Sequence, residues 1–330
     1  MSNNPLGEHE IIRLIQTRLS SMPDMPVPFG DDVSAITLEG TQTVVLKTDM
    51  LVGRTDVPKG MSLFAAARKA IVMNVSDFAS KGICPTAVLA AVGLPKALAT
   101  EVSVVEIAEG LNAGAREYGT YVVGGDTNET GDLVISISLF GTTSNRLPLR
   151  SGARVGDILA VTGRFGKPAA GLRLLLGDYK ASSELREVLV DAVYSPKARL
   201  QEGLALCGGG CVSASIDSSD GLAWSIHELS QQSGVGFLLD VLPVAVEAEE
   251  FAVQNGLDPV ELVLYGGEEY ELVLTVRPSM WGEAQTLVQA VGGCLIPIGK
   301  AIDKKQVRLI LGGEELTVEP RGWEHFKSQV

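Results

Sequence analysis

The stretch SIDSSDGL, residues 215–222, joins an apolar run to a segment with helical spacing and places two carboxylates at the junction. Ser218, Ser219 and Asp220 are residue types that cap a helix N-terminus, so a cap before GLAWSIHEL is the simplest explanation of this stretch alone. The same placement of acidic residues beside apolar runs recurs in GDDVSAI, KTDML, NVSDFAS and GGDTNE. Because open α/β sheets bind ligands at the ends of their strands, the recurrence predicts a shared acidic site on an α/β fold.

The composition is that of an ordinary globular protein, with 45% apolar and 20% charged residues in a chain of 330. This length exceeds what one hydrophobic core usually organises, which favours two domains. A formal net charge of -13 argues against a nucleic-acid partner, because such proteins need a basic surface to bind phosphates. No signal peptide or membrane-spanning run is visible, and the four cysteines lack zinc-site spacing. We therefore expect a cytoplasmic protein with reduced thiols and no membrane partner.

Apolar periodicity predicts a mixed α/β unit in each half of the chain. The expected strands lie at 43–49, 86–94, 120–126, 133–141, 158–163, 211–217, 270–276, 296–301 and 307–313. The expected helices lie at 61–82, 101–119, 167–177, 221–232 and 279–293, with a helical pair over 182–207. A polar stretch with Pro148 and several glycines separates the halves, so we place the domains at 1–148 and 149–330.

A phosphate-binding loop of the Walker type is absent. TGRFGKPAAG has Val161 where the pattern needs glycine and Pro168 where it needs Ser or Thr. Phosphates can instead be held through magnesium, which takes oxygen ligands and is usually gripped by one or two carboxylates plus the substrate phosphates. The recurring aspartates supply such ligands, and Asp77 within an apolar helical run is the most expensive of them to leave unpaired.

Each aspartate also has an ordinary structural explanation. GDD is compatible with an Asx turn, and Asp49 and Asp126, which are expected to end strands, are compatible with caps. Lys69 and Lys81, on the same predicted helix, are candidate ion-pair partners of Asp77. Six such residues together, mostly at the ends of predicted elements, favour a site for several metal ions over six separate structural roles.

The motifs occur in an order that resembles the thiamine-monophosphate kinase family, of the aminoimidazole-ribonucleotide synthetase superfamily. The resemblance rests on FGDDVSAI, LKTDMLV, KAIVMNVSDFASKGICP, GGDT, RSGARVGD, SIDSSDGL, YGGEEYEL and RGWEHF, and it covers residues 7–326. It implies a two-domain α/β (α+β) fold whose N-terminal mixed sheet forms a barrel with a second copy in a homodimer, and a C-terminal α/β domain. It also implies phosphorylation of thiamine monophosphate to thiamine diphosphate by magnesium-bound ATP.

The resemblance assigns roles to individual positions. It implies that the magnesium shell comprises Asp32, Lys47 through its backbone, Thr48, Asp49, Asp77, Asp126, Asp217 and Asp220. Of these we take Asp32, Asp77 and Asp217 as catalytic. The positions that match nucleotide contacts are Gly125, Asp126, Arg150 and Ser219, and those that match thiamine contacts are Glu268 and Trp323.

The substrate-phosphate contact departs from the family pattern. Where many members have a histidine, this chain has Asp56, with Arg54 close by. A carboxylate contacts a phosphate favourably only when it is protonated or bridged by metal, so Arg54 is the alternative for this role. Structural explanations also exist for three carried-over positions: Arg150 as a surface charge in a linker, Glu268 as an exposed acid, and Trp323 as a lid over the C-terminal core.

Two other functions compete with the kinase. One is another ATP-dependent enzyme of the superfamily. Selenophosphate synthetase needs a reactive cysteine or selenocysteine near its N-terminus, whereas the first cysteine of this chain is Cys84. The hydrogenase-maturation relative ends in a reactive cysteine, whereas this chain ends FKSQV. The third interpretation is a non-catalytic metal-binding protein.

The histidines, His9, His227 and His325, lie outside the aspartate motifs, so the sequence favours direct in-line phosphoryl transfer without a phosphorylated enzyme.

Overall fold

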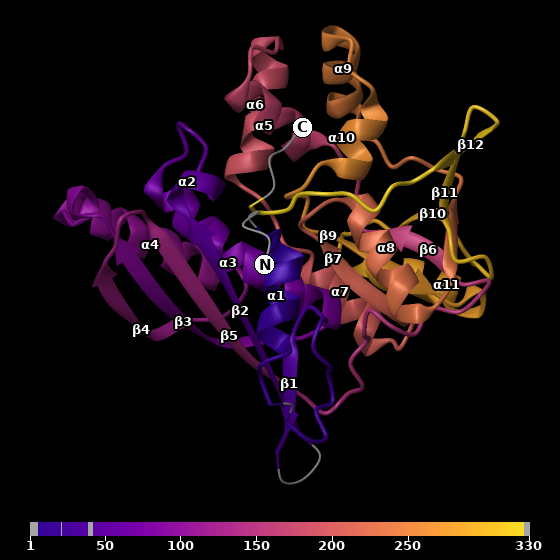
Figure 1. The fold of residues 1–330 in the computed structure, drawn as a ribbon, viewed down its shortest axis with the longest axis horizontal. Helices are drawn as coiled ribbons and strands as arrows, with labels where there is room; N and C mark the ends of the chain where they lie inside the picture. The colour runs from indigo at the N-terminus through magenta and orange to yellow at the C-terminus, as the bar shows by residue number, and fades with distance from the viewer. Residues whose placement is uncertain (1–5, 21, 39–41, 327–330) are drawn as a thin grey trace.

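The computed structural model describes residues 6–20, 22–38 and 42–326 of the chain. Two mixed sheets lie at opposite sides of the molecule, and helix α3 (Leu63–Lys81) packs between them (Figure 1). It contacts β2 (Thr43–Val52) and β5 (Val134–Thr143) of the first sheet and β7 (Val212–Ser218) and β9 (Glu271–Val276) of the second. Helix α3 therefore carries side chains that can reach both halves of the protein.

The first sheet has the strand order β1-β2-β5-β3-β4, in which only the β3–β4 pair is parallel. Its strands are β1 (Ser34–Thr37), β2 (Thr43–Val52), β3 (Pro85–Leu94), β4 (Val122–Glu129) and β5 (Val134–Thr143). The four strands predicted in this half are confirmed, but β2 and β4 run further than expected. As a result Asp49 and Asp126 lie inside strands, and the prediction that they end strands or cap the next element is wrong.

Two long helices accompany this sheet, α3 and α4 (Glu101–Glu117). The side chain of Ser62 accepts a hydrogen bond from the backbone N–H of Ala65 at the start of α3, and Gly82 ends the helix in the left-handed conformation. Most of α3 is buried, which agrees with an apolar sequence on all its faces. Shorter helical segments are α1 (Glu8–Gln16), α2 (Gly53–Asp56) and η1 (Lys96–Leu98).

The second sheet has the order β12-β11-β8-β10-β6-β9-β7. Its strands are β6 (Ile158–Val161), β7 (Val212–Ser218), β8 (Gly236–Leu239), β9 (Glu271–Val276), β10 (Ile296–Ile302), β11 (Val307–Leu311) and β12 (Glu314–Thr317). The helices of this half are α5 (Lys167–Leu176), α6 (Ser183–Tyr194), α7 (Leu200–Gly208), α8 (Leu222–Ser233), α9 (Val246–Asn255), α10 (Pro259–Tyr265), η2 (Pro278–Met280) and α11 (Trp281–Ala290). The sequence did not predict α1, β1, α2, β8, α9, α10 or β12, which are mostly short.

The junction between β7 and α8 corrects the expectation of a side-chain cap. Gly221 occupies the N-cap position of α8 with φ 118°, and no side-chain cap bond forms there. Ser218 still belongs to β7, so the chain passes from strand to helix through Ser219, Asp220 and this glycine. The Asp220 carboxylate is therefore free of a capping role.

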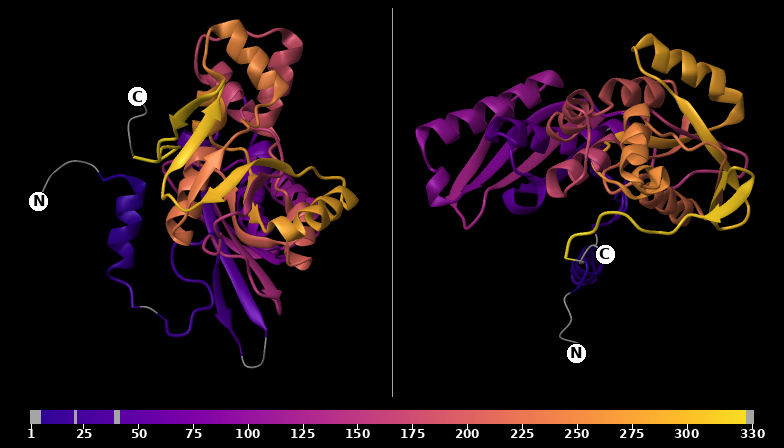
Figure 2. Two further views of the ribbon diagram at one scale, coloured as in Figure 1. Left: turned by 90° about the vertical axis from the view of Figure 1, so that its right-hand side faces the viewer. Right: turned by 90° about the horizontal axis from the view of Figure 1, so that it is seen from above.

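The predicted domain boundary at 148/149 lies between the two sheets along the chain. The largest core cluster nevertheless crosses it, since it combines Ile71 and Phe78 of α3 with Leu272 and Leu274 of β9. Helix α1 and the segment that ends the described chain lie on the same side of the molecule, where the backbone N–H of His325 donates to Glu8 at 3.2 Å (Figure 2). Among the described residues, no helix has the length and apolar character needed to cross a membrane.

Candidate active site

Three buried carboxylates meet where α3 packs between the two halves. They belong to Asp32 in the segment before β1, Asp77 on α3 and Asp217 near the end of β7. One oxygen from each lies within 4.8 Å of the other two. The sequence predicted these three residues as the core of the site, and the fold brings them together.

Helix α3 holds the other two carboxylates through its serines. The hydroxyl of Ser76 donates to Asp217 Oδ2 at 2.7 Å, and the hydroxyl of Ser80 donates to Asp32 Oδ2 at 2.5 Å. Both serines are fully buried, and they flank Asp77 on the same helix. The stretch NVSDFASKG thus contributes one carboxylate and the hydrogen-bond donors that orient two more.

Asp32 is surrounded by cations. Lys81 Nζ lies 2.8 Å from its Oδ2 and 2.7 Å from Asp31 Oδ1, while Arg150 Nε and Nη2 lie 2.7 and 2.6 Å from its Oδ1. Burial alone would raise the pKa of Asp32, but Lys81 and Arg150 outweigh it and hold this pKa far below the usual range. Asp32 is therefore ionised at any physiological pH.

The negative charges of Asp77 and Asp217 are less fully compensated by nearby cations than that of Asp32. Burial raises the pKa of Asp77 well above its usual value even though Lys47 Nζ lies 2.8 Å from its Oδ2, and the nearby charge of Asp217 raises it further. Burial and the charge of Asp32 raise the pKa of Asp217 to about 6. Burial, Glu8 and Asp217 raise the pKa of Asp220 to about 7. The cluster has a surplus of negative charge that protons neutralise in part.

This donor set fits a hard divalent cation. The three clustered groups offer carboxylate oxygens, which are the ligands that magnesium prefers. Lys47, Lys81 and Arg150 also pair with or face Asp31, Asp49 and Glu228, so the acidic groups here outnumber these three cations. A bound cation would offset the repulsion that raises the pKa values of Asp77 and Asp217. Among the described residues, the other predicted ligands lie outside this tight group of three.

The alternation of β2 separates the predicted ligands of the KTD motif. Successive side chains of a strand point to opposite faces, so Lys47 and Asp49 face α3 while Thr48 faces away. The Thr48 hydroxyl accepts from Ser138 at 3.1 Å and donates to the carbonyl of Ile137 at 3.0 Å. A hollow of about 500 Å³ lies beside this strand and is lined by residues that include Asp31, Asp32, Lys47, Thr48 and Ser138.

Gly125 and Asp126 lie on the edge strand β4, all of whose residues are exposed. A Cβ at Gly125 would lie 1.8 Å from the carbonyl oxygen of Ala90 on β3, so no larger residue fits this backbone. The neighbouring Asp126 pairs in register with Ala91 and presents its carboxylate to solvent. The structure therefore explains the glycine by close strand packing.

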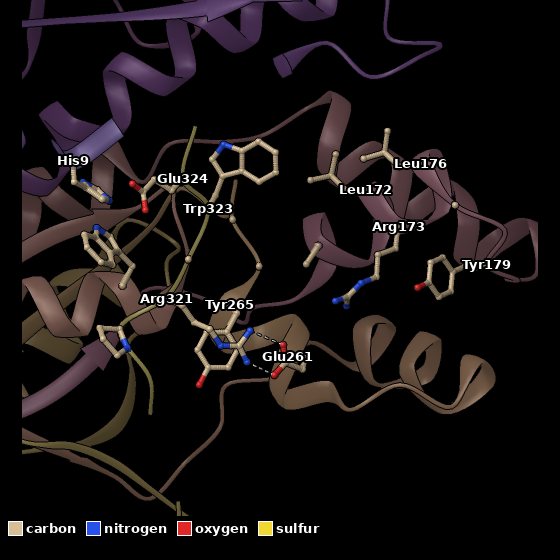
Figure 3. A pocket seen from close by; sticks show the side chains of 17 residues that line it. His9, Leu172, Arg173, Leu176, Tyr179, Glu261, Tyr265, Arg321, Trp323 and Glu324 are labelled. Carbon is tan, nitrogen blue, oxygen red and sulfur yellow. Dashed lines mark hydrogen bonds and ion pairs between the residues drawn. The ribbon is translucent and has the colours of Figure 1, made fainter. Parts of the chain in front are cut away.

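The last segment of the chain borders a second hollow, of about 610 Å³ (Figure 3). Trp323 lines it, and its backbone N–H donates to the carbonyl of Asp220 at 2.9 Å. Arg321 lies 3.5 Å from the ring centroid of Tyr265 and pairs with Glu261 on α10. His9 on α1 stacks on Trp224 with ring centroids 4.4 Å apart, and both residues line the same hollow.

The YGGEEYEL motif holds the Asp220 segment from the other side. The backbone N–H of Glu268 donates to the carbonyl of Ser219 at 2.6 Å, and that of Tyr270 donates to Ser218 at 2.9 Å. The Glu268 carboxylate pairs with Lys69 of α3. Glu268 is thus half-buried against the segment that carries Asp220, and the explanation of it as an exposed surface acid is wrong.

Two matches with known proteins cover most of this architecture. Residues 30–143 match the N-terminal domain of AIR synthase related proteins, and residues 154–312 match the C-terminal domain of the same family. A thiamine-monophosphate kinase of Nitrosopumilus maritimus is 34% identical over 322 residues, which cover 98% of this chain and 99% of that protein. The chain belongs to the thiamine-monophosphate kinase family.

Further comparisons agree with this membership. A thiamine-monophosphate kinase of Pyrococcus horikoshii is 34% identical, with 98% of this chain and 97% of that protein covered. The solved structure of AaThiL complexed with AMPPCP and TMP superposes with a TM-score of 0.84 at 30% identity and covers 97% of both chains. The two-domain mixed α/β fold is therefore that of the thiamine-monophosphate kinase family.

The structure corrects the partners that the sequence analysis gave to two residues of the site, and it adds two residues that the analysis omitted. Asp77 pairs with Lys47 of β2, so the expected ion pair with Lys69 or Lys81 is wrong. Arg150 is part of the acidic cluster, which excludes its explanation as a linker surface charge. The supporting serines, Ser76 and Ser80, were missed, although their positions on either side of Asp77 in NVSDFAS were a usable signal.

Hydrogen bonds to aspartate side chains hold the segment that contains Asp56, the position for which the sequence analysis noted a histidine in many family members. Asp56 accepts from the backbone N–H of Val52 at 2.7 Å, which closes the short helix α2. The backbone N–H of Arg54 donates to Asp132 at 3.1 Å. Asp56 therefore has a structural role in this fold, and the exposed Arg54 remains the better candidate for a phosphate contact.

Proposed function

We propose that this protein transfers the γ-phosphoryl group of ATP to the phosphate of thiamine monophosphate and so produces thiamine diphosphate and ADP. The observation that carries the proposal is the buried group of Asp32, Asp77 and Asp217 on a fold shared with AaThiL, which is complexed with an ATP analogue and TMP. Membership of the thiamine-monophosphate kinase family supports it against the other enzymes of the superfamily. A non-catalytic metal-binding protein would not need the surplus of negative charge around the cluster to be combined with a fold shared with nucleotide-bound AaThiL.

Asp32, Asp77 and Asp217 would hold magnesium, with Asp49, Asp126, Asp220, Thr48 and the backbone of Lys47 as further ligands around the nucleotide. When bound, the metal would screen the repulsion between the two anionic substrates and neutralise charge that develops in transfer. Ser76 and Ser80 keep two of the carboxylates aimed at one point, so their orientation is set before ligands arrive.

Arg150, Gly125, Asp126 and Ser219 are the proposed nucleotide contacts. Arg150 also donates to the carbonyl of Gly30 at 3.0 Å and pairs with Glu228 at 3.1 Å, so its guanidinium is held in place by several groups. The hollow of about 500 Å³ beside Lys47 and Thr48 adjoins the carboxylates and is a suitable place for polyphosphate. At Gly125, the absence of a side chain keeps β4 close to β3.

The acceptor would use the side of the site formed by Glu268 and Trp323, with Arg54 toward its phosphate. The hollow that Trp323 borders contains the aromatic residues Tyr265 and Trp224, which suit a cationic thiazolium and a flat pyrimidine. The acceptor phosphate is largely ionised near neutral pH because its second pKa is about 6. It therefore needs no general base, and we propose direct in-line transfer without a phosphorylated enzyme.

We also propose a homodimer formed through the first sheet. On β2, Val45 and Leu51 are fully buried, whereas Leu46 and Met50 on the alternate face are 40% and 54% exposed. Other large apolar residues exposed on this sheet are Leu89, Val123 and Phe140. A second copy would cover this face and the open edge at β4. Light scattering at micromolar concentration tests the proposal, and a monomer would contradict it.

The activity itself is tested by incubation of the protein with magnesium, ATP and thiamine monophosphate, followed by chromatography of the products. We expect thiamine diphosphate and ADP in equal amounts. ADP without thiamine diphosphate would indicate hydrolysis or a different acceptor, and omission of magnesium should abolish both products. The same assay with Asp217→Asn is the control for a contaminating kinase.

A further inference from the structure

Lys69 lies on α3, two turns before Asp77, and its side chain is only 1% exposed. A buried ammonium is expensive unless it is paired, so its partners define its role. Lys69 Nζ lies 2.5 Å from Glu268 Oε1 and donates to the backbone carbonyl of Asp56 at 3.1 Å. One cation therefore joins the two segments of the proposed acceptor site, which are distant in sequence.

The backbone around Glu268 is strained. Glu268 has φ 66° and Tyr270 has φ 54°, a left-handed conformation that residues other than glycine rarely adopt. The backbone N–H groups of these two residues are held by the carbonyls of Ser219 and Ser218. These bonds restrain the main chain, and the ion pair with Lys69 restrains the side chain. Such strain persists where the surrounding structure over-determines the conformation.

The other carboxylate oxygen of Glu268 is left without a partner in the described part of the chain. Glu268 Oε2 is buried, and among residues 6–20, 22–38 and 42–326 it has no hydrogen-bond partner. A buried acceptor without a donor is unfavourable by itself and is uncommon in folded proteins. Because Lys69 fixes Oε1, it also determines the direction in which Oε2 faces. Because this oxygen has no exposed surface here, a bound molecule with an N–H donor would satisfy it once a small local shift of the segment opens it to the site.

We propose that Lys69 is a positioning residue for the acceptor: it holds Glu268 so that Oε2 accepts a hydrogen bond from the amino group of the acceptor's aminopyrimidine. This inference rests on the proposed function, since thiamine monophosphate is the molecule that brings such a donor. Through the carbonyl of Asp56, Lys69 also fixes the segment that carries Arg54 relative to Glu268. Lys69 thereby sets the spacing between the two ends of the acceptor site.

Kinetics of Lys69→Met test this role when thiamine monophosphate and ATP are varied separately. We expect the KM for thiamine monophosphate to rise on the order of tenfold or more, the loss typical of a misplaced charged hydrogen bond. The KM for ATP should stay within about twofold, because Lys69 contacts no proposed nucleotide residue. Lys69→Arg, which keeps the charge, should recover part of the affinity.

Lys81→Met is a matched control from the same helix. Lys81 is equally buried, but it contacts Asp31 and Asp32 on the metal side of the site. Its loss should change the dependence on magnesium and ATP more than the KM for thiamine monophosphate. If Lys69→Met and Lys81→Met alter the same constants by similar factors, Lys69 has a general structural role and the proposal is overturned.

A double variant, Lys69→Met with Glu268→Gln, keeps the test decisive if the single variant unfolds. It removes both charges together, so thermal unfolding should return toward that of the original protein while the KM for thiamine monophosphate stays high. A normal KM for thiamine monophosphate in either folded variant would overturn the role of Lys69 and leave the proposed function intact. An original protein that phosphorylates no thiamine monophosphate would overturn the proposed function as well, so the two failures are distinguishable.

Discussion

Lys47 of β2 and Asp77 of α3 form an ion pair of 2.8 Å at the centre of the acidic cluster. Burial would lower the pKa of Lys47, but Asp77 and Asp49 raise it well above the usual value, so the ammonium keeps its charge. A lysine that faces three carboxylates is a partial substitute for a metal ion. Its presence explains how so many acidic groups fold into one place.

Asp77→Asn and Asp217→Asn should each lower turnover on the order of 100-fold or more. The reason is that each change replaces a proposed metal ligand by a neutral group of nearly the same shape. Steady-state assays at saturating magnesium measure the effect. Circular dichroism should show an unchanged fold, and near-normal turnover in either variant would remove that residue from the ligand set.

The stability of the metal-free protein should decrease as pH rises from about 5 to about 8. The folded pKa values of Asp217 and Asp220 are about 6 and about 7, above the usual 3.8 of an aspartate. In this window the folded state binds more protons than the unfolded state, so raising the pH favours unfolding. The sign is opposite to that of a carboxylate with a lowered pKa, such as Asp32, whose effect lies at much lower pH.

Thermal unfolding in EDTA across this pH range measures the effect, and added magnesium supplies the contrast. Metal binding needs the ionised carboxylates, so the stabilisation by magnesium should grow as pH rises. A metal-free protein whose melting temperature rises from pH 5 to 8 would contradict the prediction.

Gly125→Ala should destabilise the protein by about 1–3 kcal/mol, the range of overpacking in a close contact. The new methyl group would lie 1.8 Å from the carbonyl oxygen of Ala90, so β4 must move and carry Asp126 with it. We therefore also expect a higher KM for ATP. Gly131→Ala is the control, because nothing lies within 4 Å of its Cβ position. Denaturant unfolding and kinetics of both variants decide whether the contact matters.

The reaction should invert the configuration of a chiral γ-phosphorus and follow sequential kinetics. The described histidines lie outside the carboxylate cluster, and their rings make other contacts: His227 hydrogen-bonds the carbonyl of Val318, His9 stacks on Trp224, and His325 lies edge-on to Trp323. The three aspartates are committed to metal in our proposal. Retention of configuration, or a phosphoaspartate trapped from protein and ATP alone, would require a double displacement instead.

Local sequence was sufficient to predict the long elements that frame the site. The periodicity of residues 61–82 predicted a helix and that of residues 133–141 predicted a strand, because these periodicities follow from backbone geometry alone. Short elements such as α2 and β12 carry too few residues for such a signal. The positions of Asp49 and Asp126 inside strands were missed because strand ends depend on how far the neighbouring strand continues to pair.

From its residues alone the sequence predicted an acidic site, because aspartates recur beside apolar runs and a buried charge is expensive unless something compensates it. The family resemblance supplied the individual positions. Only the tertiary structure decided which cations and hydroxyls provide that compensation. The sequence offered Lys69 or Lys81 as the partner of Asp77, yet packing of β2 against α3 brings Lys47 to it and leaves Lys69 for Glu268. Partners on different elements are chosen by how those elements pack, and one-dimensional spacing carries no information about such contacts.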